Sequence, residues 1–457
     1  MIADASRVRW TVIAALAVGS GLATNSAIAM PGFARQTGLE CTACHFSWPE
    51  LTAVGRQFKL GGYTLMKPNI KGDRPLVSFS YDDNPPLLPL AGFVQASATR
   101  TSNTGGDSTD FPHQNQLMLQ QASLFWTGRI ADHLGAFAQW SYDGVEHHSA
   151  IDNFDLRLAD RRRLGGIDVM YGLSLNNSPG VTDIYQTMPV WAFPFSGSSV
   201  AAGPIASTMM EEGLAQQVAG LNLYSLWNKT VYAEIGGYRT ADGVLSFLRA
   251  GTNKADDKVL DGIAPYWRLA LQHDWGEGSH SAMLGAYGMT AKIYPDSLNP
   301  VGPTDKFRDL GLDAQYQYVT DVHRVSAQVN YIHEKQDLDA TFAAGDSANP
   351  HNTLNSFNAK LSYYYNNKYG ITFNHFRIKG DSDSGLYPND PVTGSASGSP
   401  DTSGYRVELN WLPWRDRRFT LQYTTYQKFN GAKDNYDGAG RNAKDNNSLY
   451  LLAWFPF

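Results

Sequence analysis

Five consecutive residues near the N-terminus carry the most specific chemistry in the chain. Cys41, Thr42, Ala43, Cys44 and His45 form the pattern C-x-x-C-H, which is the attachment motif of c-type haem. In that chemistry the two thiols add to the haem vinyl groups as thioethers, and the adjacent imidazole is held where it can bind the iron. The motif therefore predicts one covalent haem c, with Cys41, Cys44 and His45 as its binding residues and His45 as the proximal iron ligand.

Two other kinds of site use the same residue types. A C-x-x-C pair can be a redox-active disulfide, but no thioredoxin-like βαβ pattern surrounds this one. It can also be half of a zinc site, but no second Cys/His pair follows at finger-like spacing. The chain has only these two cysteines, so a fold built on several disulfides is excluded.

The motif does not specify the second axial ligand of the haem iron. Met66 is the nearest candidate, about one helix length beyond His45, and His/Met ligation would raise the reduction potential. Met30 and His113 are further candidates. Met66 can instead be a packing residue, because methionine is a common filler of irregular gaps.

A short helix is expected to hold the motif in place. Ser47 and Glu50 fit a capping box with Pro49 in the first turn, and Gly61-Gly62 supplies a stop. Arg56 and Lys59 are expected on the exposed face of this helix. There they would either pair with haem propionates or, as is more usual for such residues, be solvated.

From about Leu90 the hydrophobic period changes from helical to two. Between residues 308 and 318 apolar side chains alternate with polar ones. After a tight turn at Thr320-Asp321, a second run shows the same alternation, which predicts a hairpin. About sixteen such segments follow, each of the length that a tilted strand needs to cross a bilayer. They are expected to begin near residues 90, 117, 133, 151, 167, 214, 229, 264, 280, 307, 322, 354, 369, 403, 418 and 447.

The connections between these segments alternate between short and long. This parity is typical of outer-membrane barrels, which have short periplasmic turns and longer extracellular loops. The third long connection contains the apolar run Trp191–Phe195 and either folds into the lumen or packs on the rim. The chain ends in an alternating strand with terminal Phe457. The predicted fold is an all-β transmembrane antiparallel barrel of about sixteen strands after a short N-terminal helical segment.

The first residues read as a targeting signal. Arg7 and Arg9 precede an apolar run that is too short to span a membrane, and Ala27-Ile28-Ala29 fits a cleavage site. We therefore expect a signal peptide (1–29), a monohaem cytochrome segment that plugs the barrel (30–75) and a porin-like barrel (76–457). The net charge of −6 gives no indication of nucleic-acid binding, and the aromatic content of 12% suits a membrane barrel.

The segment from Phe33 to Phe46, with Pro49 and the run Gly55–Thr64, resembles the fused monohaem cytochrome c–porin family. Members of that family oxidise ferrous iron at the outer membrane and pass the electrons inward. The resemblance is residue-specific over roughly 33–65 and architectural beyond it. It implies that Cys41 and Cys44 bind the haem, that His45 is its axial ligand, that Fe(II) is the extracellular donor and that a periplasmic cytochrome c or cupredoxin is the acceptor.

Three classes of function are consistent with these observations. The first is an outer-membrane electron-transfer protein, with Fe(II) oxidation as its possible enzymatic activity. The second is a diffusion porin with a structural or sensory haem plug, and the third is a soluble periplasmic cytochrome with a β-rich partner domain. Asp309, Asp313 and Glu408 are expected to face the lumen. There they either favour the entry of a cation or are simply hydrated polar residues of the pore wall. His147 and His148 are expected in an outer loop.

Overall fold

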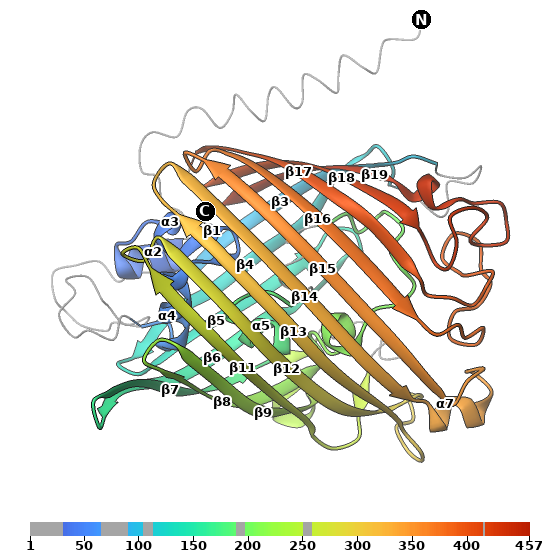
Figure 1. The fold of residues 1–457 in the computed structure, drawn as a ribbon, viewed down its shortest axis with the longest axis horizontal. Coiled ribbons are helices and arrows are strands. Elements are labelled where there is room, and N and C mark those ends of the chain that lie inside the picture. Colours follow the sequence, from blue (N-terminus) through green and yellow to red (C-terminus); the bar gives the residue numbers. More distant parts are fainter. Residues whose placement is uncertain (1–30, 65–89, 104–112, 189–196, 250–257, 415) are drawn as a thin grey trace, which may run out of the picture.

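The chain folds into a closed barrel of sixteen long antiparallel strands (Figure 1). The computed structural model describes residues 31–64, 90–103, 113–188, 197–249, 258–414 and 416–457. Each strand pairs with the next along the chain, and the last, β19, pairs with the first, β3, which closes the sheet. The barrel strands are β3 (Leu90–Thr101), β4 (Leu117–Ala131), β5 (Leu134–Asp143), β6 (His148–Leu164), β7 (Ile167–Asn176), β8 (Val218–Trp227), β9 (Val231–Thr240), β11 (Ala264–Trp275), β12 (His280–Tyr294), β13 (Asp305–Val319), β14 (His323–Asp337), β15 (His351–Tyr365), β16 (Tyr369–Gly380), β17 (Thr402–Trp414), β18 (Arg417–Lys428) and β19 (Ser448–Pro456); the two-residue β10 (Val259–Leu260) pairs beside β12.

The two faces of the barrel wall have opposite character. On β13, Leu310 and Leu312 point outward and are 50% and 53% exposed, whereas Asp309 and Asp313 point inward and are buried. The same alternation places exposed Leu, Ile, Trp and Tyr side chains on the outside of the other strands. Lipid covers such an apolar band in outer-membrane barrels. The chain is therefore a transmembrane β-barrel of the outer-membrane type.

The connections define the orientation of the barrel. Short turns join β4 to β5, β6 to β7, β8 to β9 and the later odd–even pairs, and the alternate connections at the other end are longer. The β5–β6 connection is an exception, because only residues 144–147 separate these strands. Short turns lie on the periplasmic side of outer-membrane barrels. The end that carries the short turns and the C-terminus is therefore the periplasmic end, and the other is the extracellular end.

Residues 31–64, here called the plug segment, fold into short elements at the periplasmic end (Figure 1). These are α2 (Pro31–Thr37), α3 (Cys41–Cys44), β1 (His45–Ser47), β2 (Glu50–Leu51) and α4 (Ala53–Leu60). Among the described residues, no helix is both long and apolar enough to span a membrane.

The expected start of the short helix at Ser47 is wrong. Residues 45–51 instead form the β1–β2 hairpin, and α4 begins after Thr52, whose side chain accepts a hydrogen bond from Gly55 N–H. Glu50 cannot complete a capping box, because its carboxylate is bound by side chains of the barrel wall. The expected stop at Gly61 is confirmed as the C-cap of α4.

The long β7–β8 connection folds into the lumen. It contains α5 (Pro179–Thr182) and the π-helical turn η2 (Met209–Gly213). Asp183 is fully buried there and lies 3.5 Å from the guanidinium of Arg268 on β11, which also forms an ion pair with Asp313. The described part of this connection thus takes the first of the two positions predicted for it, and Trp191–Phe195 lie outside the described residues.

The extracellular loops carry short helices and a polar clasp. The helices are η3 (Gly243–Leu248), α7 (Asp339–Ala344) and η4 (Ala443–Asn446). Asp383, in the β16–β17 loop, accepts hydrogen bonds from the backbone N–H groups of Ala348 and Leu386 and from the side chains of Ser347 and Asn352. This carboxylate therefore ties the β14–β15 loop to the β16–β17 loop.

Candidate functional site

The plug segment lies inside the periplasmic mouth of the barrel and is bound to its inner wall. Arg56 of α4 is 1% exposed, and its guanidinium donates hydrogen bonds to Gln315 (2.9 Å) and Gln317 (3.1 Å) on β13 and to Ser281 (2.5 Å) on β12. Lys59 is also buried, at 6% exposed. The expectation that Arg56 and Lys59 lie on an exposed helix face is therefore wrong, because α4 is enclosed by the barrel.

A buried ion pair provides a second attachment. Glu50 lies 2.8 Å from Lys360 Nζ on β15, and it also accepts hydrogen bonds from Gln317 Nε2 (2.9 Å) and the Ser326 hydroxyl. Both charged side chains are at most 3% exposed. Buried charges are tolerated when they are paired and hydrogen-bonded in this way.

Two arginines of the wall hold the backbone around the cysteine motif. Arg324 on β14 donates to the carbonyl oxygens of His45 and Thr42, each at 2.8 Å, and Arg418 on β18 donates to that of Trp48 at 2.9 Å. The loop that carries the motif is thus fixed from the barrel side.

The motif itself forms one helical turn. Cys41 and Cys44 begin and end α3, and both are free thiols. Gly55 of α4 packs against this turn so closely that a Cβ atom there would lie 2.1 Å from the carbonyl oxygen of Cys44. A residue without a side chain is required at this contact between α3 and α4.

His45 is oriented by the hairpin that follows it. Its Nδ1 lies 3.2 Å from the carbonyl oxygen of Pro49. A backbone carbonyl can only accept, so Nδ1 carries the proton and Nε2 is left with its lone pair. Burial lowers the pKa of His45 to about 4, against the opposing effect of the hydrogen bonds to the backbone at Pro49 and Glu50. The arrangement is the usual one for an iron-ligating imidazole whose second nitrogen is fixed by a backbone carbonyl.

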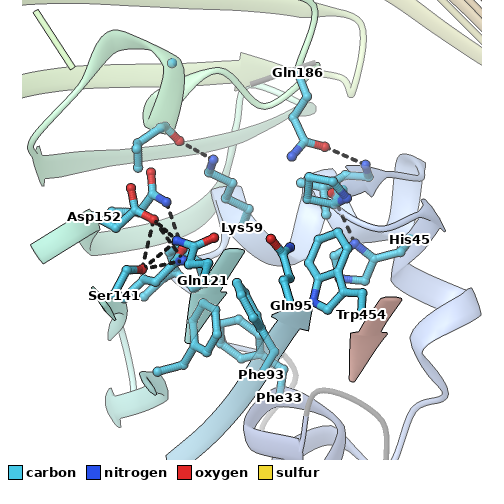
Figure 2. A pocket seen from close by; sticks show the side chains of 18 of the residues that line it. Phe33, His45, Lys59, Phe93, Gln95, Gln121, Ser141, Asp152, Gln186 and Trp454 are labelled. Atoms are coloured by element: carbon cyan, nitrogen blue, oxygen red, sulfur yellow. Dashed lines mark hydrogen bonds between the residues drawn. The ribbon is translucent and has the colours of Figure 1, made fainter. Parts of the chain in front are cut away.

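The two thiols and the imidazole line one cavity of about 700 Å³ inside the barrel. The cavity falls within the size range of cofactor sites. Its periplasmic part is walled by aromatic rings of the plug and of the barrel: Phe33, Phe58, Tyr63, Phe93, Phe125, Phe137 and Trp454. Figure 2 shows His45 and Trp454 on one side of this space and Phe33 and Phe93 below it. An aromatic cavity with two thiols and one imidazole on its wall is a donor set that fits haem c.

The thiols do not resemble a redox-active pair. Burial raises the pKa of Cys41 to about 12, with further contributions from the charges of Cys44, Glu40 and Asp416, and burial raises that of Cys44 to about 11. Reactive C-x-x-C motifs have a lowered pKa at one cysteine. This difference favours attachment chemistry over disulfide exchange. Among the described residues there is also no cluster of three or more metal-ligating side chains.

The cavity extends from the plug to the extracellular end of strands β4, β5 and β6. Its far part is polar and is lined by Gln121, Ser141 and Asp152. At the outer end it is lined by Glu146 of the β5–β6 connection and by His148, which is the first residue of β6 and not a loop residue as expected. The carboxylate of Asp152 accepts hydrogen bonds from Gln121 (2.9 Å), Gln139 (3.0 Å) and Ser141 (3.0 Å), as Figure 2 shows in part. Residues of both ends of the barrel thus share one cavity.

The other residues singled out in the sequence are not brought to this cavity. Asp309, Asp313 and Glu408 face the lumen as expected, but they lie on other parts of the wall and are bound there. His147 is in the outer loop and lies 3.2 Å from the Tyr142 hydroxyl. The residues that line the cavity do not include His113, and Met30 and Met66 lie outside the described residues.

Sequence reasoning missed several residues of the site. The aromatic rings of β3, β4 and β5 and the amides of Gln95, Gln121 and Gln139 stand at alternate inward positions, which the strand pattern contains but does not rank. Gln186, whose side chain accepts a hydrogen bond from Leu51 N–H at 2.6 Å, comes from the folded-in β7–β8 connection. No local pattern in the sequence indicates that contact.

Comparison with protein-family models and with curated protein sequences gives no match. Solved structures of porins are similar over the barrel. OmpF of Salmonella typhi in complex with daunomycin is 13% identical, with 80% of this chain and 97% of that chain covered and a TM-score of 0.47. OprB of Pseudomonas putida is 12% identical (80% and 93% covered, TM-score 0.46), and the anion-selective porin of Comamonas acidovorans is 14% identical (80% and 98% covered, TM-score 0.43). On its own strand order, closure and lipid-facing surface, this chain is a sixteen-stranded, porin-like outer-membrane β-barrel with a plug segment in its periplasmic mouth.

Proposed function

We propose that this protein is an outer-membrane c-type cytochrome that transfers electrons between an extracellular donor and a periplasmic carrier. The observation that carries the proposal is the meeting of Cys41, Cys44 and His45 on one cavity inside the barrel. Cys41 and Cys44 would hold the haem through thioether bonds, and His45 would bind its iron through Nε2. When bound there, the haem supplies one-electron oxidation and reduction.

The residues of the chain set the conditions for this chemistry. Pro49 fixes the tautomer and orientation of His45, and the aromatic wall excludes water, which tunes the reduction potential. The bilayer presents about 30 Å of insulating hydrocarbon. A cavity that extends from the cysteine motif to the extracellular loop supports access of a small donor from outside, while the motif lies at the end where a periplasmic carrier docks.

The donor that we propose is Fe(II), as the resemblance of the plug segment implies. Each Fe(II) is oxidised to Fe(III) as one oxidised carrier, a cytochrome c or a cupredoxin, gains one electron. Asp143 and Glu146 at the outer end of the cavity give it a negative potential that attracts cations.

The second candidate is a diffusion channel in which the haem plug is structural or sensory. The porin-like barrel and the length of the cavity favour this function. A wide pore is disfavoured because the β7–β8 connection fills part of the lumen. In this connection Asp183, Tyr185 and Thr187 are at most 1% exposed. A narrow path past the plug is compatible with both functions.

The two candidates differ in what crosses the membrane. The haem-loaded protein is placed in liposomes that enclose an oxidised one-electron acceptor, and Fe(II) is added outside. Electron transfer predicts reduction of the enclosed acceptor with a matching change in the Soret band of the protein, whereas a His45→Ala variant should lose most of this rate. Rapid swelling in sugar solution without reduction of the acceptor, from acidic to neutral pH, would support the channel instead.

A further inference from the structure

Lys59 of α4 brings a positive charge to the cavity of the cysteine motif. Among the described residues that line the cavity, it is the only lysine or arginine. Its ammonium group is buried and donates a hydrogen bond to the carbonyl oxygen of Val181 in α5. Figure 2 shows this side chain between His45 and the polar cluster around Asp152.

Arg56, one turn earlier on the same helix, is committed elsewhere. Its guanidinium is bound by Gln315, Gln317 and Ser281 of the barrel wall, and the residue does not line the cavity. The two cations of α4 therefore have different tasks. Arg56 attaches the plug, and Lys59 faces the cofactor space.

A buried haem needs a partner for its carboxylates. The propionates lie on the edge of the macrocycle opposite the thioether-linked vinyl groups, and a carboxylate is buried at acceptable cost only when it is paired. The extracellular part of the cavity is acidic, with Asp143, Glu146 and Asp152, and so repels a propionate. On the side next to α4 and α5, the described residues that line the cavity include Lys59 and no aspartate or glutamate.

We infer that Lys59 is the positioning residue of the haem, pairing with one propionate and thereby setting both its orientation and its reduction potential. This inference rests on the proposed function. The electrostatics of the lysine agree with it. Burial, together with the charge of Arg157, lowers the pKa of Lys59 to about 8 against the opposing carboxylates Asp155, Asp183 and Glu234, so a further anion beside it stabilises the ammonium form.

The test compares Lys59→Gln, Lys59→Arg and a control, Lys368→Gln, in the haem-loaded full-length protein. Lys368 is exposed in a short turn. The midpoint potential is measured by optical titration of the haem at several pH values. Loss of the cation leaves the propionate charge uncompensated, which stabilises the oxidised iron. We expect the ratio of oxidised to reduced haem in Lys59→Gln to rise about tenfold at a fixed potential, which is about 59 mV for one electron, and the potential of this variant to become pH-dependent near neutrality.

Lys59→Arg should keep a potential close to that of the wild type, and Lys368→Gln should match it. A wild-type potential and pH profile in Lys59→Gln would overturn the inference. If this variant does not accumulate, the wild type and Lys59→Arg are compared by resonance Raman spectroscopy. A propionate bending mode that differs between them supports pairing, and an identical mode overturns it. A wild-type preparation without covalent haem would instead overturn the proposed function itself.

Discussion

Removal of the Glu50 carboxylate should release the plug while leaving the barrel intact. Glu50 and Lys360 form an ion pair of 2.8 Å between side chains that are 1% and 3% exposed. The variant Glu50→Gln keeps the size of the side chain and can still bond to its neighbours, but it leaves the lysine without this counter-charge in the barrel wall.

The expected cost follows from the burial of the pair. Breaking a buried ion pair by removing one partner typically costs about 3–5 kcal/mol, because a charge is left uncompensated. A change of about 3 kcal/mol corresponds to roughly a 150-fold shift of an equilibrium. Replacing both residues, as in Glu50→Gln with Lys360→Met, removes the uncompensated charge and should recover most of the loss. An exposed pair is a suitable control, since Asp242 and Arg239 are 58% and 60% exposed and such pairs contribute about 0–1 kcal/mol.

Limited proteolysis of the purified protein measures this equilibrium, because cleavage of the plug tracks the population of its open form when opening is fast. We expect Glu50→Gln to be cleaved within residues 31–64 at least 100-fold faster than the wild type, with the barrel band unchanged, and Asp242→Asn to match the wild type. Cleavage of Glu50→Gln at the wild-type rate, or a double variant as labile as the single one, would show that this ion pair does not hold the plug in the barrel.

Two further predictions concern a close contact and a loop. Gly55→Ala should shift the docking equilibrium of the plug toward the undocked form by about 1–3 kcal/mol and should lower the haem content, because the added Cβ would lie 2.1 Å from the Cys44 carbonyl oxygen. Gly203→Ala, where nothing lies within 4 Å of the added Cβ, should keep the haem absorbance per barrel of the wild type. Equal haem content in both variants would contradict this prediction. For Asp383, burial opposes ionisation, but hydrogen bonds led by that from Ala348 N–H outweigh it and hold the pKa of the carboxyl well below its usual range. Its bonds therefore contribute fully above the ordinary Asp value of about 3.9 and are lost as the pH falls below it through the lowered pKa. We expect loops 338–350 and 381–401 to become sensitive to an acid protease only in that acidic range, and Asp383→Asn to be sensitive at pH 7; resistance of the variant at pH 7 would count against this role.

The barrel could be predicted well from the sequence, because its signals are local. Inward and outward residues alternate along each strand and loop length alternates along the chain, so every expected strand start lies within four residues of the observed one. The β5–β6 connection departs from the alternation of loop length, because it is short although its polar residues suggested a long loop. There β6 simply begins earlier, at His148.

The site could be predicted only in part. The spacing of Cys41, Cys44 and His45 predicts the attachment chemistry because these residues are neighbours in the sequence. The position of α4 could not be predicted, since Glu50 is bound by residues more than 250 positions away, on β13 and β15. The same long-range contacts bury Arg56 and Lys59, which were expected to face solvent. Arg56 attaches the plug to the barrel wall, and Lys59 lines the cavity.

The proposed function requires one haem that is covalently bound to the plug inside the barrel. The covalent bond is tested by purifying the protein from outer membranes, extracting it with acidified acetone and staining the denatured band for haem peroxidase activity. The wild type should keep its stain at the mobility of the full barrel protein, and a Cys41→Ala, Cys44→Ala double variant should be colourless while its barrel still assembles. A wild-type band that is colourless, or that loses all its pigment to the solvent, would show that the plug carries no covalent haem.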